Sequence, residues 1–227
     1  MGTLINVVAI LSGGTIGLIF RKRFPERISQ TALQVVALFT ILVGMKMALQ
    51  GQALIMIVIS LAFGAMLGEW MRIEEHLDRF GLWLEERLRL TEQSPAKGFI
   101  QASLLFCVGS MAIVGSITEG LEGDYSILAT KAMMDGIVSI PFAAGMGIGV
   151  LGSALPILVY QGGLTLLASK LQAFFTPVMV RELTSVGGVI IMGIGINILG
   201  LQKVRVGNLT PGLFLILLML YVQTRIL

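Results

Sequence analysis

Eight stretches of the chain are almost entirely apolar, and most charged residues fall between them. A transmembrane α-helix needs roughly 20 consecutive, mostly apolar residues. The pattern therefore predicts an all-α integral membrane protein with about eight transmembrane helices, with seven as the alternative. The predicted spans are residues 4–20, 31–50, 52–68, 99–118, 126–144, 148–168, 183–200 and 211–223.

Residues 70–88 follow a different pattern, in which apolar and charged positions recur with the three-to-four-residue period of an amphipathic helix. We expect this helix to lie on the cytoplasmic surface of the membrane, although a simple connecting arm fits the pattern equally well. The apolar positions are Trp70, Ile73, Leu77, Phe80, Leu84 and Leu88, and the charged positions are Arg72, Glu75, Arg79 and Glu86.

The composition supports a membrane protein and argues against several other classes. Hydrophobic residues make up 56% of the chain and charged residues 13%, whereas soluble domains contain about 25% charged residues. The net charge of +3 comes from basic residues in short loops, so it does not indicate nucleic-acid binding. Cys107 and His76 are the sole residues of their types, which excludes an intrachain disulfide and argues against a His/Cys zinc site.

Basic residues are distributed unevenly between the two ends of the predicted spans. The connections 21–27, 69–97 and 201–206 would share one face and together hold eleven Lys and Arg residues, whereas the other face holds three. Because basic loops stay in the cytoplasm, eight spans would place these connections inside the cell and both termini outside. An odd number of spans would remove this asymmetry.

A weak internal repeat relates the two ends of the chain. A shift of 151 residues places residues 31–49 over 182–200, with Lys46 on Asn197. With eight spans, helices 1–3 and 6–8 would then have opposite orientations in the membrane, as in the inverted repeats of many secondary transporters.

The repeat predicts one polytopic membrane domain with four parts. A first repeat would cover residues 1–69, and the amphipathic helix with its linker would cover 70–97. Central helices would occupy 98–147, and the second repeat would follow at 148–227.

Several long segments resemble a known family. They are GTLINVVAILSGGTIG at 2–17, GSMAIVGSITEGLEGD at 109–124, KAMMDGI at 131–137, GIGVLGSALPILVYQGGLTLLA at 147–168 and GIGINILGLQKVRVGNLTPGL at 193–213. On these segments the chain resembles, over essentially its whole length, the uncharacterised bacterial membrane proteins of the YqgA/YdfK type, a family of unknown function. The resemblance implies a bacterial inner-membrane component. Labels such as "possible sodium channel or pump" have been attached to such proteins without a settled mechanism.

Asp135 is the main candidate for a functional residue, because a carboxylate inside a membrane span is costly and by default suggests a functional site. Lys131 lies four residues earlier on the same helical face. Together they could bind a cation or exchange a proton, with Lys131 as a tethered counter-charge that a substrate cation displaces. A structural ion pair, or a Lys131 side chain that extends to the membrane surface, explains the same residues without a function.

Three amide side chains are further candidates for an ion site. Gln161 precedes Gly162–Gly163, where missing side chains would let the helix loosen and expose carbonyl oxygens to a hard cation such as Na⁺. The alternative is close helix packing, with Gln161 as an interhelical hydrogen-bond bridge. Asn6, and Asn197 at the repeat position of Lys46, are weaker candidates of the same kind.

Glu119, Glu122 and Asp124 form an acidic loop after the 99–118 span. On the predicted outer face they would form an acidic mouth that raises the local concentration of cations. An ordinary solvated loop is equally consistent with these residues.

Enzymatic motifs find no support in the chain. GIGVLG at 147–152 matches the dinucleotide-binding pattern G-x-G-x-x-G, but no strand precedes it. The spans contain no paired carboxylates, no histidine and no G-x-S-x-G motif. The sequence therefore does not indicate an enzyme.

These observations predict a multi-pass inner-membrane transporter or channel for a small cation, Na⁺ or H⁺, with no other cofactor. Asp135 would bind the ion, and Gln161 with loosened backbone at Gly145–Gly152 and Gly162–Gly163 would complete the site. The expected partners are membrane lipid and the cation, and not nucleic acid.

Two further possibilities follow from the sequence. Gly64 and Gly68 have the spacing of a small-residue helix surface, which is compatible with a homo-oligomer. A protein of a different class, a scaffold or sensor that transports nothing, would bind a protein partner through the amphipathic helix at 70–88.

Overall fold

The computed structural model describes residues 1–23, 26–76, 79, 95–172 and 175–226. Every regular element within these residues is a helix, which confirms the predicted all-α class. The helices divide into two compact units. The first unit comprises Met1–Val36 and Asp78–Phe174, and the second comprises Ala37–Leu77 and Phe175–Leu227.

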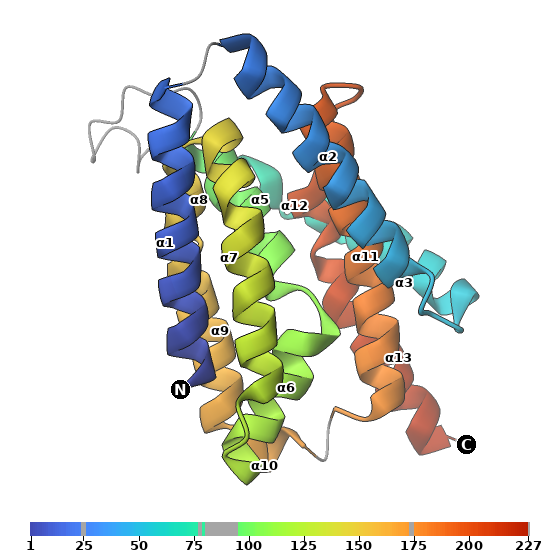
Figure 1. Ribbon diagram of the computed structural model, residues 1–227. Helices are drawn as coiled ribbons and strands as arrows, with labels where there is room; N and C mark the ends of the chain where they lie inside the picture. The colour runs from blue at the N-terminus through green and yellow to red at the C-terminus, as the bar shows by residue number, and fades with distance from the viewer. Residues whose placement is uncertain (24–25, 77–78, 80–94, 173–174, 227) are drawn as a thin grey trace. The chain divides into compact units, whose positions relative to one another are not determined.

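The helices of the first unit are α1 (Gly2–Arg23), α5 (Pro95–Cys107), α6 (Ser110–Glu122), α7 (Ser126–Met146), α8 (Gly149–Gly152), α9 (Ala154–Leu166) and α10 (Ala168–Leu171). α1 lies beside α7 and α9 (Figure 1). α1 and α7 run in parallel, because Gly2 lies against Leu128 and Gly13 lies against Gly136. α9 runs antiparallel to α1.

The second unit contains α3 (Leu54–Trp70), α11 (Pro177–Leu199), α12 (Val206–Leu209) and α13 (Pro211–Ile226), together with the part of α2 (Glu26–Ala48) from Ala37 onward. α2 and α11 are antiparallel, with Gly44 against Gly188 and Gly195 against Ala37. A helix pair can approach this closely only where side chains are small.

Gly64 and Gly68 are used within the chain. A Cβ added to Gly64 would overlap with the backbone of Gly212, and one added to Gly68 would overlap with the backbone of Asn208. α3 therefore packs antiparallel against α12 and α13 through these glycines. The small-residue surface on which the sequence analysis based a homo-oligomer is thus occupied by the protein's own helices.

Helix length and apolarity confirm the membrane class. Five helices in the described part of the chain are long and apolar enough to cross a membrane, and the bent pair α5–α6 would make a sixth. Residues 33–48 of α2 and the helix α3 are apolar but shorter. Five to six crossings are therefore supported by length, and the count of eight stays a prediction. The five helices are 2–21, 126–146, 149–166, 177–199 and 206–223.

The predicted span 99–118 is not one straight helix. α5 ends at Cys107, α6 begins at Ser110, and their axes differ by 60°. Gly109 adopts φ 157° and ψ 149°, a backbone region that is essentially restricted to glycine. The sequence analysis missed this break because the residues around it are as apolar as the helix itself.

The helix break expected between the predicted spans 126–144 and 148–168 is present. α7 ends at Met146, and Gly147 has φ 80° and ψ −162°, which again requires glycine. α8 and α9 then continue the chain as an 18-residue apolar stretch from Gly149 to Leu166. Pro141 lies inside α7 without ending it.

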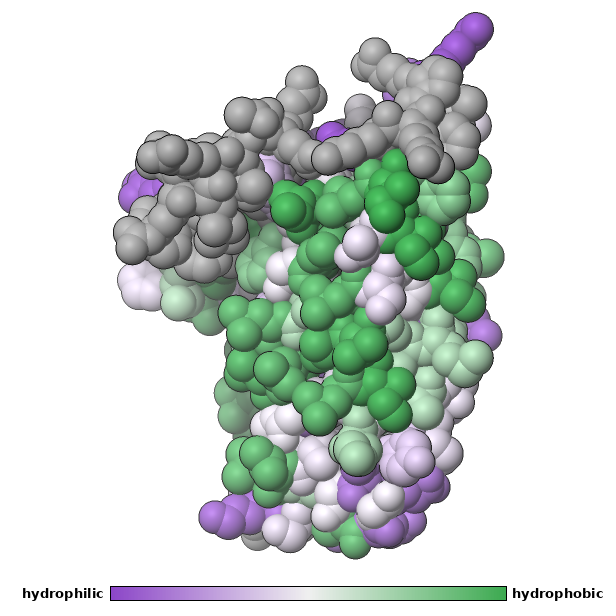
Figure 2. Space-filling view, turned by 60° about the vertical axis from the view of Figure 1, so that its left-hand side comes forward, coloured by the Kyte–Doolittle hydropathy of each residue, from purple (hydrophilic) through white to green (hydrophobic). Residues whose placement is uncertain are grey.

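The surface exposes many hydrophobic side chains, as expected for a protein in contact with lipid. Figure 2 shows hydrophobic residues over the middle of one face and hydrophilic residues gathered toward its lower end. Leu4, Val8 and Leu11 of α1 are among the exposed large hydrophobic residues. In a soluble protein such a large apolar surface would cause aggregation.

Most of the predicted amphipathic helix at 70–88 lies outside the described residues. The chain leaves α3 at Trp70, and Arg72 has a positive φ of 52°. Residues 73–76 are helical. The scaffold hypothesis built on this helix therefore stays a prediction.

Candidate functional site

Four polar side chains from three helices meet inside the first unit, and we call them the polar cluster. Asn6 of α1 donates from Nδ2 to Asp135 Oδ2 of α7 (3.0 Å) and to Gln161 Oε1 of α9 (3.2 Å). Lys131 forms an ion pair with the same Asp135 oxygen. The structure thus brings together four of the five predicted site residues, although Asn6 and Gln161 lie 155 positions apart in the sequence.

The polar cluster is buried. Asn6 and Gln161 are 0% exposed, Lys131 is 7% exposed and Asp135 is 9% exposed. Asn6 Oδ1 and Gln161 Nε2 have no hydrogen-bond partner among the described residues. A buried polar atom without a partner is destabilising, and a hydrated cation would satisfy both atoms. The ion can bind the carbonyl oxygen, and its water can accept from the amide nitrogen.

Small residues bring α1 close enough to α7 for these contacts. A Cβ added to Gly13 would overlap with the carbonyl of Gly136, and one added to Gly17 would overlap with a carbonyl one turn further along α7. Gly13 lies two turns after Asn6 on the same face of α1. The close approach of the helix backbones therefore positions Asn6 against Asp135.

The predicted loosening of Gly162–Gly163 does not occur. α9 is a continuous helix from Ala154 to Leu166, because its backbone hydrogen bonds do not depend on side chains at these positions. A Cβ added to either glycine would meet no atom within 4 Å. The glycine pair therefore neither exposes carbonyl oxygens nor serves close helix packing.

The break at Gly147 is also too far away to complete the polar cluster. Gly147 follows Asp135 by twelve residues of α7, which corresponds to about 18 Å at 1.5 Å per residue. The break between α5 and α6 lies in the same unit, and both of these helices pack against α7. Helix ends leave backbone carbonyls without intrahelical partners, so this break is a second place in the unit where backbone carbonyls are freed.

Comparison with known proteins identifies the family. A family model described as "Protein of unknown function (DUF554)" matches residues 1–221. The chain belongs to the DUF554 family. This confirms the resemblance inferred from the sequence.

Two relatives of this DUF554 protein are similar over nearly their whole length. The "Uncharacterized membrane protein YdfK" of Bacillus subtilis (strain 168) is 33% identical over 218 residues, which cover 94% of this chain and 93% of the relative. The "Uncharacterized protein YqgA" of Escherichia coli (strain K12) is 29% identical over 220 residues, covering 95% and 94%. No solved structure matches the chain. The chemistry of the DUF554 site must therefore be argued from its geometry.

The fifth predicted site residue of the DUF554 chain, Asn197, lies in the second unit and binds backbone. Its Nδ2 donates to Val204 O, and its Oδ1 accepts from Val204 N, each at 2.7 Å. These two bonds close the turn that follows α11. Asn197 thus has a structural role within the second unit.

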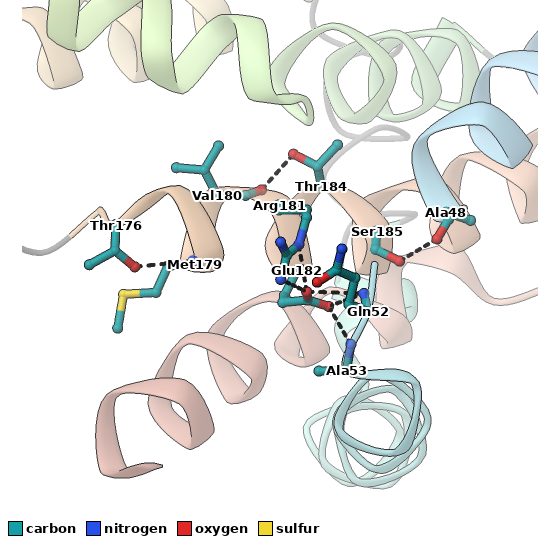
Figure 3. Close-up of polar contacts among 10 residues, drawn as sticks. All are labelled: Ala48, Gln52, Ala53, Thr176, Met179, Val180, Arg181, Glu182, Thr184 and Ser185. Carbon is teal, nitrogen blue, oxygen red and sulfur yellow. Dashed lines mark hydrogen bonds and ion pairs between the residues drawn. The ribbon is translucent and has the colours of Figure 1, made fainter. Parts of the chain in front are cut away.

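A second buried carboxylate, Glu182, was missed by the sequence analysis of this DUF554 protein. Glu182 is 0% exposed, and its carboxylate accepts from the backbone N–H of Gln52 (3.1 and 3.2 Å) and of Ala53 (3.2 Å) at the start of α3 (Figure 3). Arg181 Nε donates to the same carboxylate at 2.9 Å, and Ser185 Oγ donates to Ala48 O at 2.6 Å. The only sequence signal was an Arg-Glu pair at the edge of an apolar stretch.

Glu182 anchors the chain at the entry to α3. Its partners Gln52 and Ala53 directly precede the first helical residue, Leu54, and a carboxylate at that end of a helix also interacts favourably with the helix dipole. Because Glu182 already accepts from two amides and Arg181, it is a structural anchor of α3 and not a candidate ion site.

A further polar network holds the other end of α3. Asn208 accepts from Glu74 N at 2.8 Å and donates to Glu69 Oε2 at 2.6 Å. Gly207 N donates to Glu74 Oε2 at 2.7 Å, and Arg205 forms an ion pair with Glu69. The sequence did not indicate a role for Asn208, because its two partners, Glu69 and Glu74, are brought to it only by the tertiary fold.

The predicted acidic mouth is divided between a buried and an exposed part. Glu119 accepts from Gly2 N at 2.9 Å and is largely buried, whereas Glu122 and Asp124 are exposed. Asp124 Oδ1 accepts from Ser126 N at 2.8 Å, and this hydrogen bond lowers the pKa of the Asp124 carboxyl. Asp124 is therefore ionised at neutral pH and leaves this end of the first unit acidic.

Proposed function

We propose that this DUF554 protein transports a small monovalent cation, Na⁺ or H⁺, across the bacterial inner membrane, with Asp135 as the binding carboxylate. The observation that carries the proposal is the polar cluster. It combines one buried carboxylate with two buried amides that keep one unpartnered atom each. Ionisable residues inside membrane proteins are costly and commonly mark ion or proton pathways.

The charge of the cluster favours a monovalent ion. Asp135 is its single acid, and the described residues contain no group of three or more His, Cys, Asp or Glu that could hold a metal ion. Calcium sites generally use several carboxylates and six to eight oxygen ligands. One carboxylate with the amide oxygens of Asn6 and Gln161 suits a single positive charge.

Lys131 competes with a substrate cation for the Asp135 carboxylate. Its ammonium occupies the Asp135 carboxylate, so a substrate cation must displace it before binding. Two positive charges at one carboxylate repel each other strongly in a partly buried site. We therefore propose that Lys131 loses its proton when the cation binds, which couples cation binding to proton release.

The architecture is consistent with inverted repeats. α2 and α11, which the 151-residue shift superposes, each contain 23 residues and run antiparallel. The helix directions within each unit are those that eight alternating crossings require. We propose that the repeats invert in the membrane and that both termini lie outside, as the basic loops suggest.

Cation flux in proteoliposomes tests the proposal. Purified protein is reconstituted, and Na⁺ uptake and lumenal pH are followed after a Na⁺ gradient is imposed. Asp135→Asn should abolish flux. The double variant Asp135→Asn with Lys131→Gln should abolish it too, and this variant leaves no buried charge without a partner in the polar cluster. Glu182→Gln is the matched control, because it makes the same change at a buried carboxylate outside the polar cluster and should retain flux.

Lys131→Arg separates transport from a purely structural ion pair. Arginine keeps the pair but does not lose its proton, so transport by displacement should fail while thermal stability is retained. A structural pair would tolerate the change in both respects. Wild-type-like flux in folded Asp135→Asn, or in folded Lys131→Arg, would refute the assignment.

A further inference from the structure

Unpartnered buried polar atoms are concentrated in one part of the molecule. Seven buried side-chain atoms have no hydrogen-bond partner among the described residues, and all seven belong to the first unit. Buried polar side chains of the second unit, such as Glu182 and Ser185, are hydrogen-bonded. Native proteins leave few such atoms, so this concentration requires an explanation. The seven residues are Thr3, Asn6, Gln101, Ser116, Glu119, Gln161 and Thr165.

Six of these residues form three pairs, and the two members of each pair lie one helical turn apart on the same helix. Residues three or four positions apart share a face of a helix. Each of the helices α1, α6 and α9 therefore presents a polar stripe two residues long. The pairs are Thr3 and Asn6 on α1, Ser116 and Glu119 on α6, and Gln161 and Thr165 on α9.

The outer members of the three pairs meet at the acidic end of the unit. Glu119 accepts from the backbone N–H of Gly2, the neighbour of Thr3. A Cβ added to Gly120 would overlap with the backbone carbonyl of Thr165. α1, α6 and α9 therefore converge where Glu119 lies.

Two of the inner members, Asn6 and Gln161, belong to the polar cluster, where Asn6 donates to Gln161 and to Asp135. Ser116 lies one turn before Glu119 on α6, on the same face as Gly120, which packs against Thr165 of α9. Ser116 is 0% exposed. The three stripes thus extend from Glu119 toward the Lys131–Asp135 pair.

We propose that these six side chains line a hydrated path along which a small cation reaches the Lys131–Asp135 pair from the acidic end of the first unit. The nature of the cargo rests on the proposed function, but the path itself is read from the unpartnered atoms. Hydroxyl, amide and carboxyl groups that the protein does not satisfy are satisfied by water. Exposed Glu122 and Asp124 attract cations to its entrance.

Gln101, the seventh residue, is not part of the path. It lies on α5, and none of the contacts described above joins it to the six. Thr165 is only half-buried, as expected for a residue near the entrance.

Accessibility of single cysteines to Ag⁺ tests the path without any assay of transport. Ag⁺ is a small monovalent cation that reacts with thiols. In a Cys107→Ser background, Ser116→Cys or Thr165→Cys is introduced, and the protein in liposomes is exposed to Ag⁺. The remaining free thiol is then labelled with a maleimide after denaturation in SDS.

Ala143→Cys provides the control. Ala143 lies on α7, about two turns beyond Asp135 on the side away from the acidic end, and is equally buried, with 0% exposure. We expect Ag⁺ to block Ser116→Cys and Thr165→Cys about tenfold faster than Ala143→Cys, and an anionic thiosulfonate to show no such preference. Ser116→Cys and Thr165→Cys blocked no faster than Ala143→Cys, in protein that unfolds at the wild-type temperature, would overturn the path.

The result is separable from the proposed function. Fast reaction at Ser116→Cys without Asp135-dependent flux would support the path and refute transport. Asp135-dependent flux without reaction at either cysteine would keep transport and show that the cation enters elsewhere, which overturns the path.

Discussion

Removal of the Glu182 carboxylate should release the start of α3. The carboxylate accepts from Gln52 N and Ala53 N at 3.1 to 3.2 Å and is completely buried. A hydrogen bond to a charged group contributes about 1.5 to 3 kcal/mol. Because the two amides share one carboxylate, we take the lower value for each, which gives about 3 kcal/mol. Arg181 adds little, since its side chain is one-third exposed.

This loss is measurable as local opening. Three kcal/mol corresponds to about a hundredfold change in an equilibrium constant, so the amides at 52–57 should exchange with deuterium about a hundredfold faster in Glu182→Ala. Glu182→Gln keeps one acceptor oxygen and should accelerate exchange about tenfold. The measurement is hydrogen exchange with mass spectrometry in detergent micelles.

Peptides of α13 provide the internal control, because they belong to the same unit but do not contact Glu182 through any hydrogen bond described here. Their exchange should stay within about threefold of wild type. Exchange at 52–57 that is unchanged in Glu182→Ala would refute this anchoring role of Glu182. Equal acceleration at 52–57 and in α13 would also refute it, because it would show global destabilisation in place of a released helix start.

Two further predictions concern α1 and α7. Gly13→Ala should destabilise the protein by about 1 to 3 kcal/mol, because its Cβ would overlap with the carbonyl of Gly136. Thermal unfolding in detergent measures this loss of stability. As the control, Gly162→Ala, whose Cβ would meet no atom, should unfold at the wild-type temperature or above it. Equal effects of the two changes on the unfolding temperature would contradict the packing of Gly13 against α7. The second concerns Asp124, whose pKa is lowered by its bond to Ser126 N. A carboxyl whose pKa is lower in the folded protein than in the unfolded chain stabilises the fold at pH values above its unfolded pKa, and this stabilisation is lost as the pH falls through its folded pKa. The amide resonance of Ser126, which reports on the Asp124 carboxylate, should therefore titrate with a midpoint below the ordinary Asp value of pH 3.8. A midpoint above pH 3.8 would contradict the assignment.

The ion pair illustrates what a local pattern can establish. Lys131 and Asp135 are four residues apart in a helical stretch, so they must share a face, and the helical period alone predicts their contact. Asn6 and Gln161 could be chosen as candidates because amides are unusual in apolar spans. Their meeting at one carboxylate could not be predicted, since it depends on α1 lying against both α7 and α9.

The breaks in the helices show the opposite case. Both Gly109 and Gly147 adopt backbone conformations that require glycine, but the chain contains 28 glycines and most of them lie within helices or at helix contacts. The glycines at 147 and at 162–163 therefore looked equally able to break a helix, whereas the structure breaks the chain at Gly147 and after Cys107 and leaves 162–163 helical.

Lipid as the solvent, the helical class, the family and the shared helix face of Lys131 and Asp135 followed from the sequence, because hydrophobic period, composition and local motifs are properties of the chain itself. The tertiary structure alone decided which polar groups find partners. It satisfied Glu182 with the amides of α3 and left Asn6, Ser116 and Gln161 with unpartnered atoms along three facing helices. Hydrogen-bond satisfaction depends on distances between residues far apart in the chain, and no pattern along the chain carries that information.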